Sequence, residues 1–226
     1  MKPENWPKEI EYLTALTYSK SVTSHLHRGL QTLSVNCSPI LDNQLLRMPS
    51  PLVCITPIKD RSHPAHGQHG LHATRDLPPS SFIILYLGCV HTSLATDAKY
   101  DPDSDYDLSL DRELGLAVDA THEGNEARFI NDYRGVRVSG PNAEFKDCWV
   151  SSGANGKLEK RIGVFVVSAG KAGKRRKGIK ASEEIVVSYG KGFWNGRRGE
   201  QAEEAGGGVA EGGHLAWQQR HALEDD

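Results

Sequence analysis

The chain has 226 residues and a mass of 24.8 kDa, a length that favours a single domain and is ample for a packed core. It carries 27 Lys and Arg residues against 29 Asp and Glu residues, so the formal net charge at pH 7 is −2. This balance argues against a uniformly basic nucleic-acid-binding protein, and the 38% hydrophobic fraction argues against disorder along the whole chain.

The near-zero net charge is the sum of three strongly charged segments of opposite sign. Residues 97–126 hold ten acidic residues and two basic ones, residues 157–180 hold nine basic residues and one acidic one, and the chain after Gly199 holds seven acidic residues and one Arg. On electrostatic grounds the acidic block suits a basic peptide as partner. The basic run Lys171–Lys177 is interpreted as a loop between two strands, with a nuclear-localisation or phosphate-contacting patch as the alternative.

In chain order, residues 1–53 are predicted to form an N-terminal extension with a short helix over residues 8–16. Short apolar runs broken by Gly and Pro then predict strands over 52–55, 81–87, 114–118, 143–150, 161–167 and 184–187. We find no long amphipathic helix between residues 52 and 195, so the sequence predicts a mainly β (α+β) domain. The Gly- and Glu-rich residues 196–226 are predicted to be a flexible tail.

The cysteines and histidines do not predict a metal site. The four cysteines contain no Cys-x-x-Cys pair, so we expect reduced, mostly buried thiols at Cys37, Cys54, Cys89 and Cys148. Histidines recur at every third residue, at His63, His66, His69 and His72. The prolines and glycines between them argue against a helix, and a step of three alternates the faces of a strand, so we expect loop histidines.

The sequence gives no sign of membrane insertion or secretion. No apolar run near Met1 suits a signal peptide, and no stretch reaches the roughly 18 apolar residues that a membrane helix needs. We therefore expect a nuclear or cytoplasmic protein.

Three segments form a pattern more specific than any of their residues alone. They are Gly70–Leu77 (Gly-Leu-His-Ala-Thr-Arg-Asp-Leu) with the strand after it, Gly124–Asn131 (Gly-Asn-Glu-Ala-Arg-Phe-Ile-Asn) followed by Pro141–Phe145, and Glu183–Gly190 (Glu-Glu-Ile-Val-Val-Ser-Tyr-Gly) followed by Phe193 and Trp194. Their order and separation resemble the SET-domain family of protein lysine methyltransferases, over residues 54–195. The chain resembles a variant without the cysteine clusters that flank this domain in nuclear histone enzymes.

The resemblance implies a fold and a cofactor. The fold would consist of several small β-sheets with short helices and loops, and residues 127–131 would be threaded beneath a neighbouring loop in a pseudoknot. The cofactor would be S-adenosylmethionine, bound on one face of the domain. A peptide would bind the opposite face, with its lysine in a narrow channel between the two sites.

The resemblance also implies which residues contact the cofactor. His69, Gly70 and Leu71 match the turn whose backbone approaches it, and Asn131 and Asp132 match the pair that holds its methionine and adenine parts. Arg128 matches a supporting position of the same segment. Trp194 is placed to cover the adenine.

The catalytic and channel positions follow from the same resemblance. Tyr189 matches the tyrosine at the meeting point of the methyl group and the lysine nitrogen, so it is both the catalytic candidate and a cofactor contact. Tyr86 and Phe145 match aromatic residues that line the lysine channel. Val187 matches a position where Phe or Tyr often tunes the number of methyl groups added.

The chemistry of methyl transfer suits these residue types. Transfer from a sulfonium is an in-line displacement that needs no metal but requires a neutral amine held at near-attack distance. A free lysine has a pKa of about 10.4, so its deprotonation at pH 7 costs roughly 4–5 kcal/mol. A dry aromatic channel lowers that pKa because it disfavours the ammonium form.

The leading hypothesis is therefore an S-adenosylmethionine-dependent protein lysine methyltransferase acting on a histone tail or another basic protein. The alternative is a catalytically silent SET-like module that binds a protein or chromatin partner, motivated by Gln68 and Asp132, which depart from the family pattern. A third hypothesis, nucleic-acid binding by the basic loop, predicts salt-sensitive affinity but is not favoured. We expect a monomer that does not contact a membrane.

Overall fold

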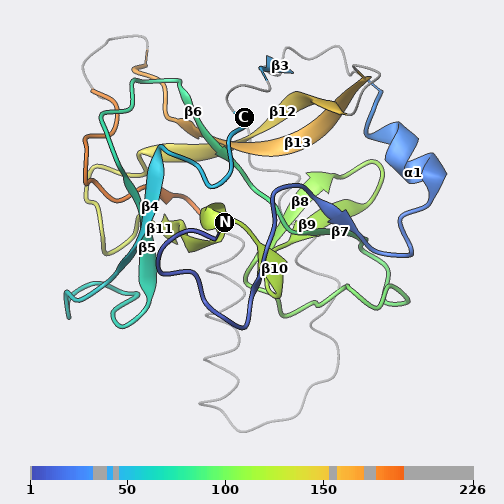
Figure 1. Cartoon of the computed structure of the whole chain (residues 1–226), viewed down its shortest axis with the longest axis horizontal. Helices are drawn as coiled ribbons and strands as arrows, with labels where there is room; N and C mark the ends of the chain where they lie inside the picture. Colours follow the sequence, from blue (N-terminus) through green and yellow to red (C-terminus); the bar gives the residue numbers. More distant parts are fainter. Residues whose placement is uncertain (1, 33–39, 43–45, 153–156, 171–176, 191–226) are drawn as a thin grey trace, which may run out of the picture. The chain divides into compact units, whose positions relative to one another are not determined.

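Short strands separated by turns make up most of the computed structural model, which describes residues 2–32, 40–42, 46–152, 157–170 and 177–190 (Figure 1). The chain divides into two units, Met1–Val187 and Ser188–Asp226. The described part of the first unit contains five small sheets, one α-helix and one 3₁₀-helix with named bounds. The prediction of a mainly β fold of small sheets is therefore confirmed.

The largest strands form a sheet in the order β3-β12-β13-β6. Its members are β3 (Ile40–Leu41), β12 (Ala143–Ser152), β13 (Lys157–Val166) and β6 (Phe82–Leu85). β12 and β13 form a long antiparallel hairpin, the longest ribbon in Figure 1. Alternate side chains of this sheet pack into a buried cluster with Leu41, which gives the sheet an apolar face.

A second sheet has the order β2-β7-β9-β8. Its members are β2 (Thr17–Tyr18), β7 (Cys89–Thr92), β9 (Leu116–Asp119) and β8 (Asp107–Asp111). Every residue of β7 and β9 is buried, so the polar residues in these strands need internal partners. His91 meets this requirement because its Nε2 lies 3.1 Å from Asp107 Oδ1 and its Nδ1 lies 3.1 Å from the carbonyl of Thr92.

Three two-stranded sheets join segments that are far apart in the sequence. β4 (Val53–Pro57) pairs antiparallel with β5 (His69–Ala73). β1 (Glu11–Tyr12) pairs parallel with β10 (Glu123–Gly124), and β11 (Asn131–Asp132) pairs parallel with β14 (Val186–Val187). The 3₁₀-helix η2 (Glu126–Phe129) lies between β10 and β11.

The helix of the N-terminal extension lies at α1 (Ser24–Gly29), where the Thr23 hydroxyl accepts a hydrogen bond from the backbone N–H of Leu26. The helix predicted over residues 8–16 is wrong. Glu11 and Tyr12 instead form β1, and the backbone N–H of Leu13 donates to the carbonyl of Gly124 at 2.7 Å, so a tertiary partner overrides the local apolar spacing. None of the helices in the described part is long and apolar enough to cross a membrane.

The six predicted strands all have counterparts, in β4, β6, β9, β12, β13 and β14. Three longer strands were not predicted: β5, β7 and β8. β5 contains two histidines and a glycine and so lacks the apolar alternation from which a strand is predicted. β8 does alternate, with Leu108 and Leu110 between polar residues, but the acidic composition around it masked this signal. The boundaries expected at 53/54 and 195/196 stay predictions, and the tail expected over 196–226, Cys37 and residues 171–176 of the basic run lie outside the described residues.

Candidate functional site

The three sequence motifs meet around residues 182–187. On one side of this segment the N–H of Ile185 donates to the carbonyl of Leu71 at 2.7 Å. On the other side β14 pairs with β11, and the N–H of Tyr133 donates to the carbonyl of Val187 at 2.9 Å. The segment thus lies between β5 and β11, an arrangement consistent with the threading that the pseudoknot requires.

Asn131 and His69, two of the expected cofactor contacts, lie side by side. The Nδ2 of Asn131 donates to the carbonyl oxygen of His69 at 3.4 Å and to Glu184 Oε1 at 2.9 Å. The first bond is long and therefore weak, and the second joins the amide to a carboxylate. The turn and the Asn131 strand are therefore brought together as the sequence predicts.

Glu184 is a member of this cluster to which sequence reasoning gave no role. Its Oε2 lies 3.0 Å from His63 Nε2, and the two side chains are 13% and 10% exposed. A Cβ atom on Gly70 would lie only 2.6 Å from Glu184 Oε1, so the glycine leaves room for the carboxylate. The glutamate lies within the third motif, and a charged residue beside a buried β14 was the signal that could have identified it.

Asn142 is a second residue without a predicted role, and it is only 2% exposed. Its Oδ1 accepts a hydrogen bond from the N–H of Val186 at 2.8 Å, and its Nδ2 donates to the carbonyl of Glu184 at 2.8 Å. The side chain thus fixes the backbone of the 182–187 segment. Its position directly after Pro141, in the middle of the second motif, was the available signal.

Asp132 is 7% exposed and is paired with Arg134. Its Oδ1 accepts from the backbone N–H of Arg134 at 2.8 Å, and its Oδ2 accepts from the Arg134 guanidinium at 2.8 Å. That guanidinium also lies 5.0 Å from the centre of the Tyr133 ring. The carboxylate therefore contributes to a local ion pair on β11.

Arg128 packs against the backbone and rings next to η2. Its Nε donates to the carbonyl of Ala120 at 2.9 Å, and its guanidinium carbon lies 4.3 Å from the centre of the Tyr106 ring and 5.2 Å from that of Phe129. These contacts fix η2 against β9, whose end leads into Ala120. The role that the resemblance gives to Arg128 at the cofactor site stays a prediction.

Tyr86 and Phe145, the two predicted channel aromatics, are in contact. Their ring centres lie 5.7 Å apart in an edge-to-face arrangement, and Tyr86 is only 4% exposed. The hydroxyl of Tyr86 donates to the carbonyl of Tyr106 at 2.7 Å. Val187 is buried at the end of β14.

Asn125 fixes the strand that carries Tyr86, a role that the sequence did not reveal. The side chain is fully buried, its Nδ2 donates to the carbonyl of Leu85 at 2.8 Å, and its Oδ1 accepts from the N–H of Leu87 at 3.1 Å. The residue after it, Glu126, accepts hydrogen bonds from the Tyr12 hydroxyl at 3.1 Å and from the N–H of Ser50 at 2.8 Å. The second motif is therefore tied both to β6 and to the N-terminal extension.

The proposed catalytic residue lies in the second unit. Tyr189 is half-buried, and next to it the N–H of Gly190 donates to the hydroxyl of Ser188 at 3.2 Å. In the sequence, Tyr189 follows β14 by two residues. Trp194 lies outside the described residues.

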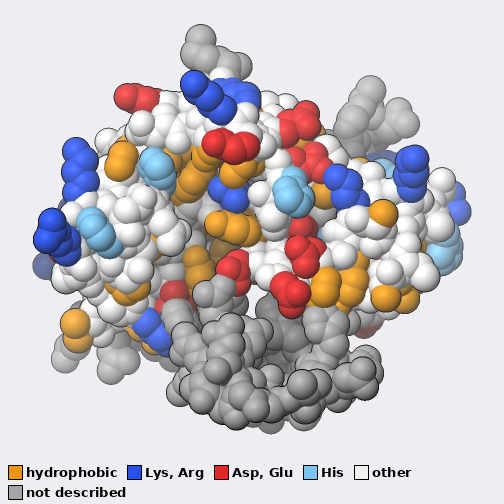
Figure 2. Space-filling view, turned by 90° about the horizontal axis from the view of Figure 1, so that it is seen from below, with side chains coloured by type: hydrophobic (Ala, Val, Ile, Leu, Met, Phe, Trp, Pro, Cys, Tyr) orange, Lys and Arg blue, Asp and Glu red, His pale blue; other side chains and the backbone are white. Residues whose placement is uncertain are grey.

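The acidic block is less available to a partner than its composition indicates. Six of its acids are buried or half-buried, and their side chains accept hydrogen bonds or pair with cations inside the first unit, at Asp97, Asp107, Asp111, Asp119, Glu123 and Glu126. The other four are exposed, at Asp101, Asp103, Asp105 and Glu113. The face in Figure 2 accordingly mixes acidic, basic and histidine side chains.

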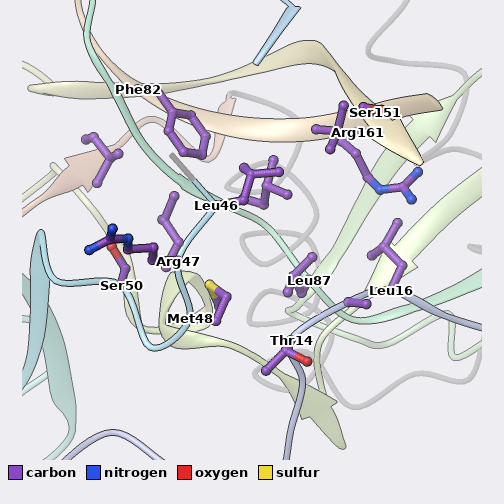
Figure 3. A pocket seen from close by; sticks show the side chains of 15 residues that line it. Thr14, Leu16, Leu46, Arg47, Met48, Ser50, Phe82, Leu87, Ser151 and Arg161 are labelled. Carbon is purple, nitrogen blue, oxygen red and sulfur yellow. The ribbon is translucent and has the colours of Figure 1, made fainter. Parts of the chain in front are cut away.

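A cavity of about 240 Å³ lies between the N-terminal extension, β6 and the β12–β13 hairpin (Figure 3). Leu16 and Met48 of the extension and Phe82 and Leu87 from the β6 region point into it. Every residue of β6 lines it, and so does Leu87, whereas Tyr86 contacts Phe145. The described lining of the cavity does not include the two channel aromatics.

The residues around Asn131 fit the methionine part of the cofactor that the sequence resemblance implies. Hydrogen bonds between β5 and the 182–185 segment begin at Leu71, and the carbonyl of His69, two residues earlier, accepts the long bond from Asn131. Carbonyl and carboxylate oxygens, here of His69 and Glu184, suit an ammonium group. This acceptor set fits the ammonium group of the methionine part.

Comparison with known proteins identifies the domain. The family model of the SET domain matches residues 68–190, which is more than half of the chain. No curated protein matches the chain.

Several solved structures of polycomb repressive complex 2 are similar to part of the chain. One is an active complex in the basal state, with 26% identity and a TM-score of 0.41, covering 55% of this chain and 14% of that one. Another is a humanised mutant of the Chaetomium thermophilum complex bound to an inhibitor, with 24% identity and a TM-score of 0.42, covering 61% of this chain and 15% of that one. A third is the ctPRC2 complex in an autoinhibited conformation bound to S-adenosylmethionine, with 23% identity and a TM-score of 0.44, covering 67% of this chain and 17% of that one. The chain thus spans about a sixth or less of the length of these structures' chains.

Proposed function

The chain belongs to the SET-domain family, and from this premise we propose that it is a protein lysine methyltransferase that uses S-adenosylmethionine. The observation that carries the proposal is the convergence at β5 and β11, where Asn131 Nδ2 reaches the carbonyl of His69 across 62 positions of sequence. Two motifs that the sequence predicts to share a cofactor meet there.

In this proposal the cofactor contacts of the first unit are the backbone of His69, Gly70 and Leu71 and the side chain of Asn131. When bound, the cofactor supplies a methyl group on a positively charged sulfur. The oxygens of His69 and Glu184 place negative charge and dipoles near the cationic end of its methionine part. Trp194 is proposed to cover the adenine.

The lysine channel is proposed to include Tyr86, Phe145 and Val187. The edge-to-face pair of Tyr86 and Phe145 is fixed by the hydrogen bond from the Tyr86 hydroxyl to Tyr106. A rigid apolar wall disfavours the ammonium form of an entering lysine and so supplies part of the free energy of its deprotonation. We propose that Tyr189 orients the neutral amine through its hydroxyl.

The test is methyl transfer to a basic protein mixture from labelled S-adenosylmethionine, with Tyr189→Phe as the variant. Loss of an orienting hydroxyl is expected to lower the rate by about 100-fold. The control is Tyr100→Phe, which removes a hydroxyl outside the three motifs and is expected to leave the rate unchanged. Lysine labelling that survives Tyr189→Phe would contradict the catalytic assignment.

The proposed substrate is a lysine in a basic protein, with histone tails as the first candidates and the nucleus as the proposed compartment. The support is electrostatic and is smaller than the sequence indicated, because four exposed acids of the 97–126 block can attract a basic peptide. The SET-domain structures above belong to a polycomb complex, but this chain covers only a small share of their length. We propose that the chain acts as a monomer.

One observation favours the silent module as a second candidate. The carboxylate of Asp132, where the family usually has a histidine, accepts hydrogen bonds from Arg134 on both oxygens. Calorimetric titration of the folded protein with S-adenosylmethionine separates the two candidates. Binding supports the enzyme, and absence of binding supports the silent module.

A further inference from the structure

We propose that His63 and Glu184 position Asn131, so that His63 sets the affinity of the cofactor site without contacting the cofactor. This inference rests on the proposed function, since it concerns the residue that would hold the methionine part. Glu184 is the link between them, with Oε2 at 3.0 Å from His63 Nε2 and Oε1 at 2.9 Å from Asn131 Nδ2.

The hydrogen bonds of His63 determine which of its nitrogens carries the proton. The backbone N–H of Ala65 donates to His63 Nδ1 at 3.0 Å, so Nδ1 is an acceptor and Nε2 carries the hydrogen. The Nε2–H group then donates to Glu184 Oε2, at 3.0 Å. A neutral imidazole in this tautomer therefore restrains the carboxylate by a directional hydrogen bond.

The other contacts of Glu184 leave its carboxylate little freedom. Its backbone is bridged to His72 on β5 and accepts a hydrogen bond from Asn142. Its carboxylate lies over Gly70, the position where any larger residue would displace it. With the backbone fixed, the side-chain torsions are set by its two hydrogen bonds, one to His63 and one to Asn131.

The three neighbouring histidines do not take this role in the described structure. The ring of His69 lies 6.0 Å from that of Phe129, and Nδ1 of His72 lies 3.4 Å from the carbonyl of Gly70. His66 is exposed. Of the four histidines that recur at every third residue, His63 is the one paired with Glu184.

The orientation of the Asn131 amide depends on this relay. An amide whose Nδ2 donates to Glu184 and His69 has one donor directed to the carboxylate and one to the start of β5, and its oxygen is directed away from both. If Glu184 loses the bond from His63, its carboxylate can rotate and the amide loses its strong acceptor. The free protein then samples several amide orientations, and binding must restore one of them.

The experiment compares three variants: His63→Phe, which keeps a ring and removes the donor; His63→Gln, which restores an N–H donor; and His66→Phe, a control in the same loop. The affinity for S-adenosylmethionine is measured by calorimetry, and the Asn131 side-chain NH₂ resonance is recorded by ¹⁵N NMR without cofactor. We expect His63→Phe to weaken binding about 10-fold, the loss expected for one hydrogen bond to a charged group. It should also shift the Asn131 resonance, raise KM for the cofactor and leave kcat nearly unchanged.

His63→Gln is expected to recover most of the affinity, and His66→Phe is expected to match the original protein. An unshifted Asn131 resonance in folded His63→Phe would overturn the relay, whether or not the cofactor binds. Failure of the original protein to bind the cofactor, with a shifted resonance, would overturn the proposed function and the claim about affinity but leave the relay itself supported. Equal loss in all three variants would show a loop effect and overturn the role of His63.

Discussion

Glu159 on β13 and Glu184 before β14 are both buried or nearly buried carboxylates that pair with a histidine, yet their surroundings differ. Glu159 is 1% exposed and accepts hydrogen bonds from the Tyr18 hydroxyl at 2.5 Å and from the Arg161 guanidinium at 2.6 Å, and its Oε1 lies 3.1 Å from His27 Nε2. Glu184 is 13% exposed and is bonded by neutral groups, the amide of Asn131 and the imidazole of His63.

The different partners of the two glutamates distinguish a hydrogen-bond network that joins parts of the fold from one that lies in the proposed cofactor site. The partners of Glu159 are a cation, a phenol and an imidazole that join β2, α1 and β13, so its network connects the N-terminal extension to the large sheet. The network of Glu184 includes Asn131, whose Nδ2 also donates to the carbonyl of His69, so it contains two of the proposed cofactor contacts. Glu159 thus satisfies groups that belong to the fold, whereas Glu184 restrains residues of the proposed site.

The largest effect is expected for Glu159→Ala. Removing the carboxylate leaves the Arg161 guanidinium, which is 13% exposed, without its main partner. Breaking a buried ion pair in this way costs about 3–5 kcal/mol of the free energy of unfolding, which urea denaturation would measure. The matched control is Glu144→Ala on β12, whose pair with Lys146 is about 40% exposed and is expected to contribute less than about 1 kcal/mol. Equal losses in the two variants would contradict the distinction between the two kinds of carboxylate.

The next-largest effect is expected on acidification, which protonates Glu159 and weakens its network. Burial alone would raise the pKa of Glu159, but the hydrogen bond and charge of Arg161 and the hydrogen bond of Tyr18 lower it to about 2. Because the pKa is lowered in the folded protein, the stabilisation is present above the ordinary value of 4.5 and is lost as the pH falls toward 2. This corresponds to about 3 kcal/mol, measured as the change in unfolding free energy between pH 5 and pH 2 at roughly 1.4 kcal/mol per pKa unit.

Glu159→Gln is the comparison for this acid titration. Glutamine cannot titrate, so the difference in unfolding free energy between the original protein and the variant should shrink as the pH falls. A difference that stays constant from pH 5 to pH 2 would mean that the ionisation of Glu159 contributes nothing.

The smallest effect on stability is expected for Gly70→Ala, which instead tests the site. The new Cβ would meet Glu184 Oε1 at 2.6 Å, and the flexible end of that side chain can move aside, so we expect a loss of about 1–3 kcal/mol. Displacing the carboxylate from Asn131 should weaken S-adenosylmethionine binding as well. The control is Gly163→Ala, where the Cβ would meet the Phe165 ring at 2.6 Å, with a similar loss of stability and no loss of affinity. If both variants bind the cofactor equally well, Glu184 has no role at the site.

The motifs made much of the site predictable from sequence. Gly70, Asn131 and Val187 lie in segments whose order is specific, and the structure brings these segments together at β5, β11 and β14. The polar residues that fix the segments were not predictable in the same way. Glu184 bonds to His63 and Asn131, which are 121 and 53 positions away, and Asn142 bonds to the backbone of Val186, 44 positions away. A local signal could mark Glu184 and Asn142 as unusual residues, but a single sequence does not show which partners they have.

The sequence also did not show which acidic side chains of residues 97–126 are exposed. By composition, residues 97–126 form one acidic block, but Asp97 accepts hydrogen bonds from Ser19 and Thr92, and these bonds hold the pKa of Asp97 below its ordinary value although burial opposes this. Asp119 is bonded to Ser104 and Thr121 in the same way. Which acids face solvent depends on strand pairing in the β2-β7-β9-β8 sheet.

The sequence by itself determined the family pattern, the succession of short strands and the identity of the residues at the motif positions, because these depend on local spacing and residue type. Only the tertiary structure decided that Glu11 and Tyr12 form a strand, that Glu159 joins the extension to the sheet, and that Glu184 links His63 to Asn131. The physical reason is that each of these results from hydrogen bonds between residues remote in the chain, whose free energy exceeds the local preference of the segments involved.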